Sequence, residues 1–206
     1  MNLNSLKKIS GDASFRSFYR GKKSILVFCK KEKRINLEIY DAVNKILNKN
    51  NIIAPKLISH NYKKNFIEIE DFGNQTVFEI LKKNKNKKNF FYKKTMKLLH
   101  KLQKIKNLKI KTFLGSSYKI PIYTKKKLLD EANLFIKWYL PYFVKGSKKK
   151  LLNEKLKKVF NSLLNKLYYK KNVFVHRDFH VSNLMYLKKN IGLIDSQDAQ
   201  MGHIAY

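Results

Sequence analysis

Cysteine is nearly absent from this sequence, and so are long apolar runs. Cys29 is the only cysteine in 206 residues, which excludes a disulfide framework or a cysteine-based zinc site and fits a reducing compartment. The longest wholly apolar stretches have about five residues, as in 25–29, far short of the roughly 20 that cross a bilayer. Residues 1–14 lack the apolar core of a signal peptide. We therefore expect a cytoplasmic protein with no membrane partner.

Arginine and acidic residues are also scarce, although the chain is strongly basic. The formal net charge is +32, and 42 of the 46 basic residues are Lys. Surfaces that read nucleic acids usually contain Arg, because its planar guanidinium makes bidentate contacts. Asn is abundant (21 residues) and Ala is rare (6), a bias typical of an AT-rich genome. We interpret the charge as a solvated Lys-rich surface and expect no specific nucleic-acid partner.

The first part of the chain, residues 1–73, is predicted to form a β-rich lobe. Two β-type runs, 14–20 and 24–30, flank Gly21-Lys22-Lys23, a pattern typical of a hairpin. Residues 34–48 carry apolar residues at helical spacing, and two more strands are predicted over 57–60 and 66–70. With a further strand before the first of these, the order strand, strand, strand, helix, strand, strand predicts a five-stranded sheet packed on one helix.

The pattern becomes mostly helical after a predicted boundary at residues 71–74. Helices are predicted over 76–82, 90–104, 125–140 and 149–167, with surface connections at 82–88 and 107–120. A strand over 173–175 and a hairpin follow. A β-rich lobe followed by a helical lobe over 74–206 indicates an α+β protein with a nucleotide cleft between the lobes.

Three polar residues near the end of the chain are candidates for catalysis. The predicted strands 184–187 and 191–194 form a hairpin, so Asn183 and Asp195 should lie at its open end with Cβ atoms about 5 Å apart. An amide oxygen and a carboxylate at that spacing are hard ligands that can share a Mg²⁺ ion. Asp178, on the preceding loop 176–183, can accept the proton of an incoming hydroxyl. Phosphoryl transfer requires these groups.

These residues resemble the aminoglycoside phosphotransferase family, which has the protein-kinase-like fold. The resemblance rests on the segment from Phe174 to Met185, which contains His176-Arg177-Asp178 and Asn183, and on Ile194-Asp195 with Gln197-Asp198-Ala199. It implies a bilobal fold with a β-rich N-lobe and a helical C-lobe. It also implies that Asp178 is the catalytic base in contact with the substrate, that Asn183 and Asp195 hold Mg²⁺, and that ATP is the phosphate donor.

Two further segments are similar to the anomeric N-acetylmuramate and N-acetylglucosamine kinases of this family: residues 11–20 and residues 131–140. The resemblance implies that residues 10–16 cover the ATP phosphates through Gly11, Ser14 and Arg16, although an ordinary hairpin turn fits too. It implies that Glu131 contacts sugar hydroxyls, although its spacing with aromatic residues is also typical of a core.

The nucleotide-orienting residues are less well defined. The resemblance places a hinge at 68–71, where the backbone of Ile69 and Glu70 would bind adenine. The strand 24–30 has no central Lys, so Lys30 or Arg16, with Glu38 as the helix acid, would have to orient ATP; a solvent-facing Lys30 fits equally well. Asp198 either supports the metal site or caps a turn, and His176 is expected to brace the loop through hydrogen bonds.

The implied function is transfer of the ATP γ-phosphate to a hydroxyl of a small amino sugar, in the recycling of cell-wall sugars. An aminoglycoside- or choline-type kinase is one alternative. A kinase fold that binds nucleotide or RNA without catalysis is another. Family members continue past the segment that matches 202–206, so we expect the C-lobe of this chain to be truncated.

Overall fold

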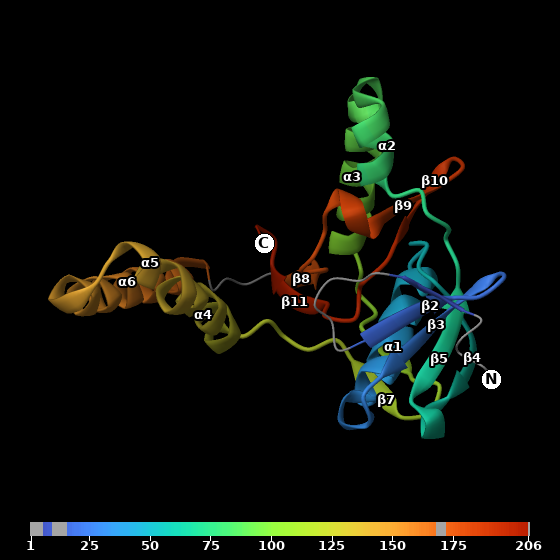
Figure 1. The fold of residues 1–206 in the computed structure, drawn as a ribbon, viewed down its shortest axis with the longest axis horizontal. Helices are drawn as coiled ribbons and strands as arrows, with labels where there is room; N and C mark the ends of the chain where they lie inside the picture. The colour runs from blue at the N-terminus through green and yellow to red at the C-terminus, as the bar shows by residue number, and fades with distance from the viewer. Residues whose placement is uncertain (1–5, 10–15, 168–171, 206) are drawn as a thin grey trace. The chain divides into compact units, whose positions relative to one another are not determined.

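The computed structural model describes residues 6–9, 16–167 and 172–205, which form two compact units (Figure 1). The first unit comprises residues 1–120 and 176–199, and the second comprises 121–175 and 200–206. This division follows packing contacts and does not coincide with the boundary predicted at residues 71–74. A functional lobe boundary at 71–74 stays a prediction.

An antiparallel sheet of five strands, in the order β1-β2-β3-β5-β4, lies in the first unit. Its strands are β1 (Lys7–Ile9), β2 (Arg16–Arg20), β3 (Ser24–Cys29), β4 (Leu57–Asn61) and β5 (Phe66–Glu70). The predicted turn between β2 and β3 is confirmed, because Arg20 pairs with Ile25 and the Gly21 N–H donates to the Ser24 carbonyl at 2.8 Å.

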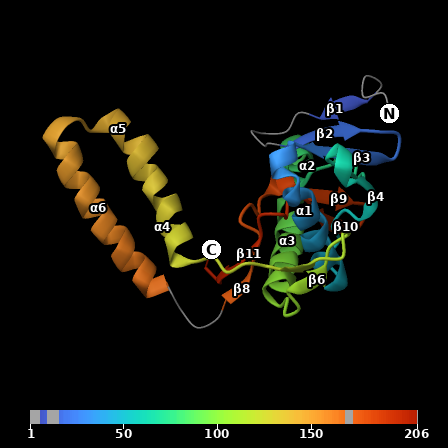
Figure 2. The same cartoon turned by 90° about the horizontal axis from the view of Figure 1, so that it is seen from below.

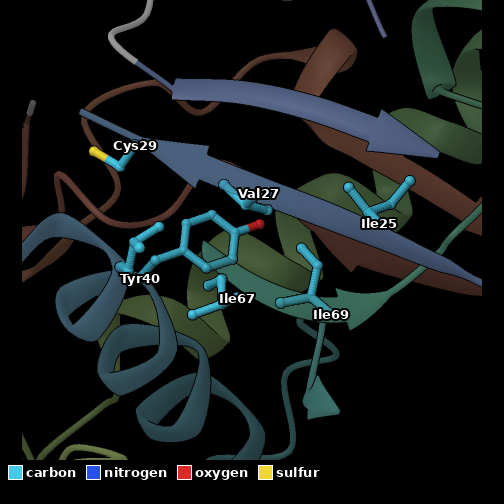
Figure 3. Packing of buried hydrophobic residues seen from close by; sticks show 7 residues of the cluster. Ile25, Val27, Cys29, Tyr40, Ile67 and Ile69 are labelled. Carbon is cyan, nitrogen blue, oxygen red and sulfur yellow. The ribbon is translucent and has the colours of Figure 1, made fainter. Parts of the chain in front are cut away.

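Helix α1 (Ile35–Lys49) packs against this sheet, as its apolar spacing predicted. The shared core contains Leu37 and Tyr40 from the helix, together with Val27 and Ile67 from the strands, all at most 3% exposed. Figure 3 shows the Tyr40 ring lying against the strands beside Val27 and Ile67. Helix and sheet therefore form one apolar layer that fixes the orientation of α1.

The segment after β5 is held by Arg20. Its guanidinium donates to the Asp71 carboxylate at 3.0 Å, to the Gly73 carbonyl at 2.9 Å and to the Asn74 side chain. The same carboxylate accepts the Gly73 N–H at 2.8 Å. A single Arg on β2 therefore anchors the turn that leads from the sheet into the first helix of the predicted second lobe.

Two helices and a hairpin also belong to the first unit. They are α2 (Val77–Lys83), α3 (Lys88–Gln103), β9 (Leu184–Leu187) and β10 (Asn190–Leu193). The hairpin is attached to the rest of the unit by backbone bonds, from the Tyr186 N–H to Gln75 and from the Leu193 N–H to Ile53, both 2.8 Å. The predicted helices over 76–82 and 90–104 are confirmed within one or two residues.

The interval 107–120, predicted as a surface connection, contains a short hairpin of β6 (Lys109–Lys111) and β7 (Ser117–Lys119). The segment lies mostly at the surface, as predicted. The hairpin within it was missed because each strand has only three residues, too few for an alternating pattern to stand out. The hairpin packs on α1 and supplies the hydroxyls of Thr112 and Ser116 to its buried Glu38.

The second unit is built mainly from helices (Figure 2). Helix α4 (Lys125–Leu134) continues through a π-helical turn (Phe135–Tyr139) into α5 (Leu140–Phe143), and α6 (Gly146–Leu167) packs beside α4. The strand β8 (Asn172–Val175) pairs with β11 (Gln200–His203), which was not predicted. Among the described residues, no helix combines the length and apolarity needed to cross a bilayer.

Candidate active site

The predicted hairpin is present as β9 and β10, with its second strand one residue earlier than expected. Leu184 pairs with Leu193, and beyond this pair the Ile194 N–H donates to the Asn183 carbonyl at 3.1 Å. Asn183 and Asp195 therefore leave the same open end of one hairpin. Asp195 adopts a positive φ of 61°, a backbone conformation that few residues other than Gly adopt, Asn, Asp and His most often, and that is frequent at functional sites.

The loop that precedes the hairpin is braced by His176, as expected. This imidazole is 3% exposed; its Nε2 lies 3.1 Å from the Ile194 carbonyl, and its Nδ1 accepts the Asp178 N–H at 3.3 Å. Burial lowers the pKa of His176, which keeps the ring neutral. A neutral ring that donates from Nε2 and accepts at Nδ1 can join the loop to the strand end, so His176 has a structural role.

Asp178 is presented at the surface of this loop with both carboxylate oxygens oriented. Its side chain is 53% exposed, Oδ2 accepts from Asn183 Nδ2 at 2.8 Å, and Oδ1 lies 3.0 Å from His180 Nε2. His180 is itself held, because its Nδ1 accepts the Ser182 N–H at 3.2 Å. Sequence reasoning missed His180. Its place two residues after Asp178 on the same loop was the available signal.

Asp195 is held from two sides through one oxygen. Its Oδ1 accepts from Arg16 Nη2 and from Gln197 Nε2, each at 3.1 Å, and the carboxylate remains 37% exposed. The Gln197 amide also donates to Asp198 at 2.9 Å. Asp198 is exposed and supports Asp195 indirectly through Gln197, so the structure connects it to the candidate site.

The side chains of Asn183 and Asp195 are of a kind that suits a magnesium ion carried by a nucleotide, and that they hold one stays a prediction. The Asn183 amide nitrogen is bonded to Asp178, which leaves the amide oxygen for a cation. No group of three or more His, Cys, Asp or Glu side chains among the described residues is arranged to hold a metal. Magnesium commonly takes one or two protein ligands and completes its octahedron with phosphates and water. Two oxygen ligands suit that mode.

Arg16 lies at the start of β2 and is enclosed by aromatic rings. Its guanidinium carbon is 5.8 Å from the centre of the Phe18 ring and 5.9 Å from that of Tyr40, and its side chain is 5% exposed. Burial raises the pKa of Tyr40 to about 12, so this ring stays neutral beside the cation. Contact of Arg16 with ATP phosphate stays a prediction. Gly11 and Ser14 lie outside the described residues.

Lys30 and Glu38 are not arranged as the predicted nucleotide-orienting pair. Lys30 follows β3 and is exposed, whereas Glu38 is 5% exposed on α1. The Glu38 carboxylate accepts from the hydroxyls of Thr112 and Ser116 at 3.0 and 3.1 Å. It therefore secures the β6–β7 hairpin on α1, and this differs from the expected role of pairing with an ATP-binding cation.

Some backbone groups at the predicted hinge already make hydrogen bonds within the protein. Ile69 is 3% exposed within β5, and the Glu70 N–H donates to the Lys56 carbonyl at 3.0 Å. The Glu70 carboxylate in turn accepts the Lys56 N–H at 3.1 Å. The Glu70 N–H is therefore not available to adenine as expected, and a hinge contact would have to use carbonyl groups or residues after Glu70.

Glu131 lies on α4 in the second unit and accepts a hydrogen bond from the Tyr123 hydroxyl. The aromatic residues that follow it do not form a core, because Trp138 is 62% and Tyr139 54% exposed. The rings of Phe135 and Tyr139 stack with their centres 5.0 Å apart. The core interpretation was wrong, and contact of Glu131 with a sugar stays a prediction.

Cavity size does not identify this site. A cavity of about 910 Å³ in the first unit lies between α1 and the β6–β7 hairpin, lined by residues such as Asn44, Lys45 and Lys111. It is lined by none of Asp178, Asn183 and Asp195. We base the assignment on the oriented polar side chains, because phosphoryl transfer depends on positioned charges more than on cavity volume.

Comparison with a family profile identifies the protein family of this chain. The profile described as "Phosphotransferase enzyme family" (APH) matches residues 5–206. The chain belongs to this family. The match confirms, over nearly the whole chain, the resemblance to phosphotransferases that residues 174–185 and 194–199 indicated.

Several proteins with a curated name are similar to this phosphotransferase chain in sequence. The N-acetylmuramate/N-acetylglucosamine kinase of Pseudomonas aeruginosa is 25% identical over 200 residues, covering 96% of this chain and 56% of the relative. The protein of the same name from Neisseria meningitidis is 25% identical over 201 residues, covering 96% and 58%. The chain thus spans a little more than half the length of the curated relatives it matches.

Solved phosphotransferase structures share the fold. The streptomycin-ATP-APH(2")-IIa ternary complex aligns with a TM-score of 0.67 at 15% identity, covering 98% of this chain and 68% of that one. A choline/ethanolamine kinase family protein from Mesorhizobium loti aligns with a TM-score of 0.59 at 10% identity, covering 97% and 60%. These similarities confirm the α+β, protein-kinase-like fold.

Proposed function

We propose that this phosphotransferase moves the γ-phosphate of ATP to a hydroxyl of an amino sugar such as N-acetylmuramate or N-acetylglucosamine. The observation that carries the proposal is the convergence of Asp178, Asn183 and Asp195 on one loop and hairpin end. The similarity to kinases named for these two sugars supports the choice of acceptor. Because the chain spans only part of those relatives, its own activity and acceptor are proposals.

The chemistry assigns a separate task to each side chain. Asp178 would accept the proton of the sugar hydroxyl as the hydroxyl oxygen forms its bond to the γ-phosphorus and the bond to the β–γ bridging oxygen breaks. Asn183 and Asp195 would hold Mg²⁺, which when bound neutralises phosphate charge. The bond from Asn183 to Asp178, 2.8 Å long, would keep the base and the metal ligand in fixed relation. The products are ADP and the sugar phosphate.

Location and partners follow from the substrates of this reaction. A kinase that consumes ATP and recycles wall sugars would act in the cytoplasm, where ATP is available. The Lys-rich surface would attract anionic nucleotides without selecting a nucleic-acid sequence. Binding of RNA or DNA should then collapse as salt rises, because only diffuse charge would drive it.

The decisive experiment is an acceptor screen with purified protein. ATP consumption is measured with Mg²⁺ and with N-acetylmuramate, N-acetylglucosamine, an aminoglycoside or choline as acceptor. Turnover with an N-acetylated amino sugar, and little with the others, is the expected result. Preferential turnover of aminoglycoside or choline would replace the proposed acceptor. Binding of Mg-ATP without turnover of any acceptor would support the non-catalytic alternative.

A further inference from the structure

A buried hydrogen bond joins helix α1 to the residue that follows Asp195. Ser196 is 0% exposed, and its hydroxyl donates to the Asn44 Oδ1 at 2.6 Å. Asn44 is 2% exposed and lies in the middle of α1, 152 residues away in sequence. A bond between two buried side chains so far apart in the chain specifies one relative position of the helix and the hairpin end.

Both ends of the Asn44 amide are engaged. While its oxygen accepts from Ser196, its nitrogen donates to the Pro55 carbonyl at 2.9 Å. The amide cannot rotate without breaking one of these bonds, and an unpaired buried polar atom is costly. The loop after α1 therefore holds Asn44 in the orientation that receives Ser196.

The same helix reaches Asp195 by a second route. Tyr40 lies one turn before Asn44 and packs under the guanidinium of Arg16, which is bonded to the Asp195 carboxylate at 3.1 Å. The backbone of Asp195 is thus restrained through Ser196, and its carboxylate through Arg16. Its positive φ of 61° is a conformation that persists when the surroundings enforce it.

We propose that Asn44 and Ser196 are positioning residues that orient Asp195 for the magnesium-nucleotide complex. The inference rests on the proposed function, since it assigns Asp195 to the metal. It also explains how α1 could act on the site although Glu38, its expected acid, is bonded to Thr112 and Ser116. In this phosphotransferase a polar bond would connect the helix to the metal ligand.

The test measures metal affinity separately from turnover and from stability. Mn²⁺ binding to the full chain with a saturating non-hydrolysable ATP analogue is followed by electron paramagnetic resonance in wild type and Ser196→Ala. Loss of one buried hydrogen bond is expected to weaken Mn²⁺ binding about tenfold. The kcat for the sugar should fall by a similar factor, while the KM for the sugar stays unchanged.

Asn48→Ala is the matched control. Asn48 lies one turn after Asn44, and its amide nitrogen donates to the Asn44 and Ala54 carbonyls at 3.0 and 2.9 Å. This variant should lose stability without losing Mn²⁺ affinity. If both variants lose affinity equally, or if Ser196→Ala keeps wild-type affinity, the positioning role is overturned.

Two further results separate a failure of this inference from a folding defect and from a failure of the proposed function. Should Ser196→Ala fail to fold, Ser196→Cys of similar size and weaker donor strength replaces it, and unchanged Mn²⁺ affinity there overturns the inference. If the wild type itself binds no Mn²⁺ with the nucleotide, the proposed function fails together with this inference. If the wild type binds Mn²⁺ and Ser196→Ala binds it equally well, only the inference fails.

Discussion

Arg16 and Asp195 form an ion pair across 179 residues of sequence, with Nη2 of the guanidinium 3.1 Å from Oδ1 of the carboxylate. The Arg16 side chain is 5% exposed and the Asp195 side chain 37% exposed. The first strand residue after the predicted nucleotide-covering loop is thus bonded directly to the predicted metal ligand. This contact makes the orientation of the predicted metal ligand depend on the N-terminal sheet.

Replacing Arg16 by Ala should weaken both the fold and the site. Arg16→Ala loses a charge-assisted hydrogen bond to Asp195 and the contacts with two rings. Because solvent screens the partly exposed Asp195 carboxylate, we expect the free energy of unfolding to fall by only about 1–2 kcal/mol. Urea denaturation measures this fall in the free energy of unfolding. Arg34→Ala is the control, because Arg34 lies 4.7 Å from the centre of the Tyr62 ring without touching the hairpin. Equal losses would contradict the proposed role of the ion pair.

Replacing Asp178 by Asn should abolish turnover and preserve nucleotide binding. Asn keeps the size of the side chain and can still accept the Asn183 bond, but it cannot take a proton. We expect kcat to fall by a factor of about 10²–10⁴ with Mg-ATP affinity nearly unchanged. The exposed Asp130 on α4 provides Asp130→Asn as a control with the same chemical change. Wild-type turnover in Asp178→Asn would remove Asp178 as the base.

Gly192 on β10 should not tolerate a larger side chain. A Cβ at this position would lie 2.8 Å from Phe72 and 2.9 Å from Leu187, closer than real Cβ contacts. We expect Gly192→Ala to destabilise the protein by about 1–3 kcal/mol, measured as the free energy of unfolding. At Gly21 the nearest atom is 3.4 Å away, so Gly21→Ala should cost less. A neutral Gly192→Ala variant would show that the hairpin does not pack closely on Phe72.

Acidification should destabilise the protein through His176. Burial lowers the pKa of this ring below its ordinary value of 6.5, so the unfolded state binds the proton more tightly than the folded state. Stability that is present above pH 6.5 is therefore lost as the pH falls toward the lowered folded-state pKa. Urea denaturation between pH 8 and pH 5 should show a flatter dependence for His176→Gln than for wild type. The exposed His100 serves as the control, and His100→Gln should keep the wild-type dependence. An equally steep loss in His176→Gln would assign the effect to other groups.

Local sequence patterns predicted the hairpin that bears the candidate site residues and the helix α1. The hairpin of β9 and β10 follows from two apolar runs around a polar turn, and its register places Asn183 beside Ile194 and hence near Asp195. Helix α1 follows from apolar spacing in the same way. Such predictions depend on neighbours within a few residues, which the sequence displays directly.

The hydrogen-bond partners and the burial of individual side chains were predicted less well. Glu38 was expected to face a nucleotide-binding cation, but the structure bonds it to hydroxyls of the β6–β7 hairpin. The aromatic spacing in 131–140 was also typical of a core, but the structure leaves Trp138 exposed. Neither outcome is encoded in local spacing. A short hairpin with no clear pattern supplies the Glu38 partners, and burial of a helical stripe depends on what packs against it.

By itself, the sequence determined which polar groups make up the candidate site and their order along the chain: a carboxylate, an amide and a second carboxylate on one loop and hairpin, because strand pairing is a local property. Only the tertiary structure decided which distant residues hold them. Arg16 reaches Asp195 and Asn44 reaches Ser196 because the sheet, α1 and the hairpin pack together, and contacts across more than 150 residues leave no pattern in a single sequence.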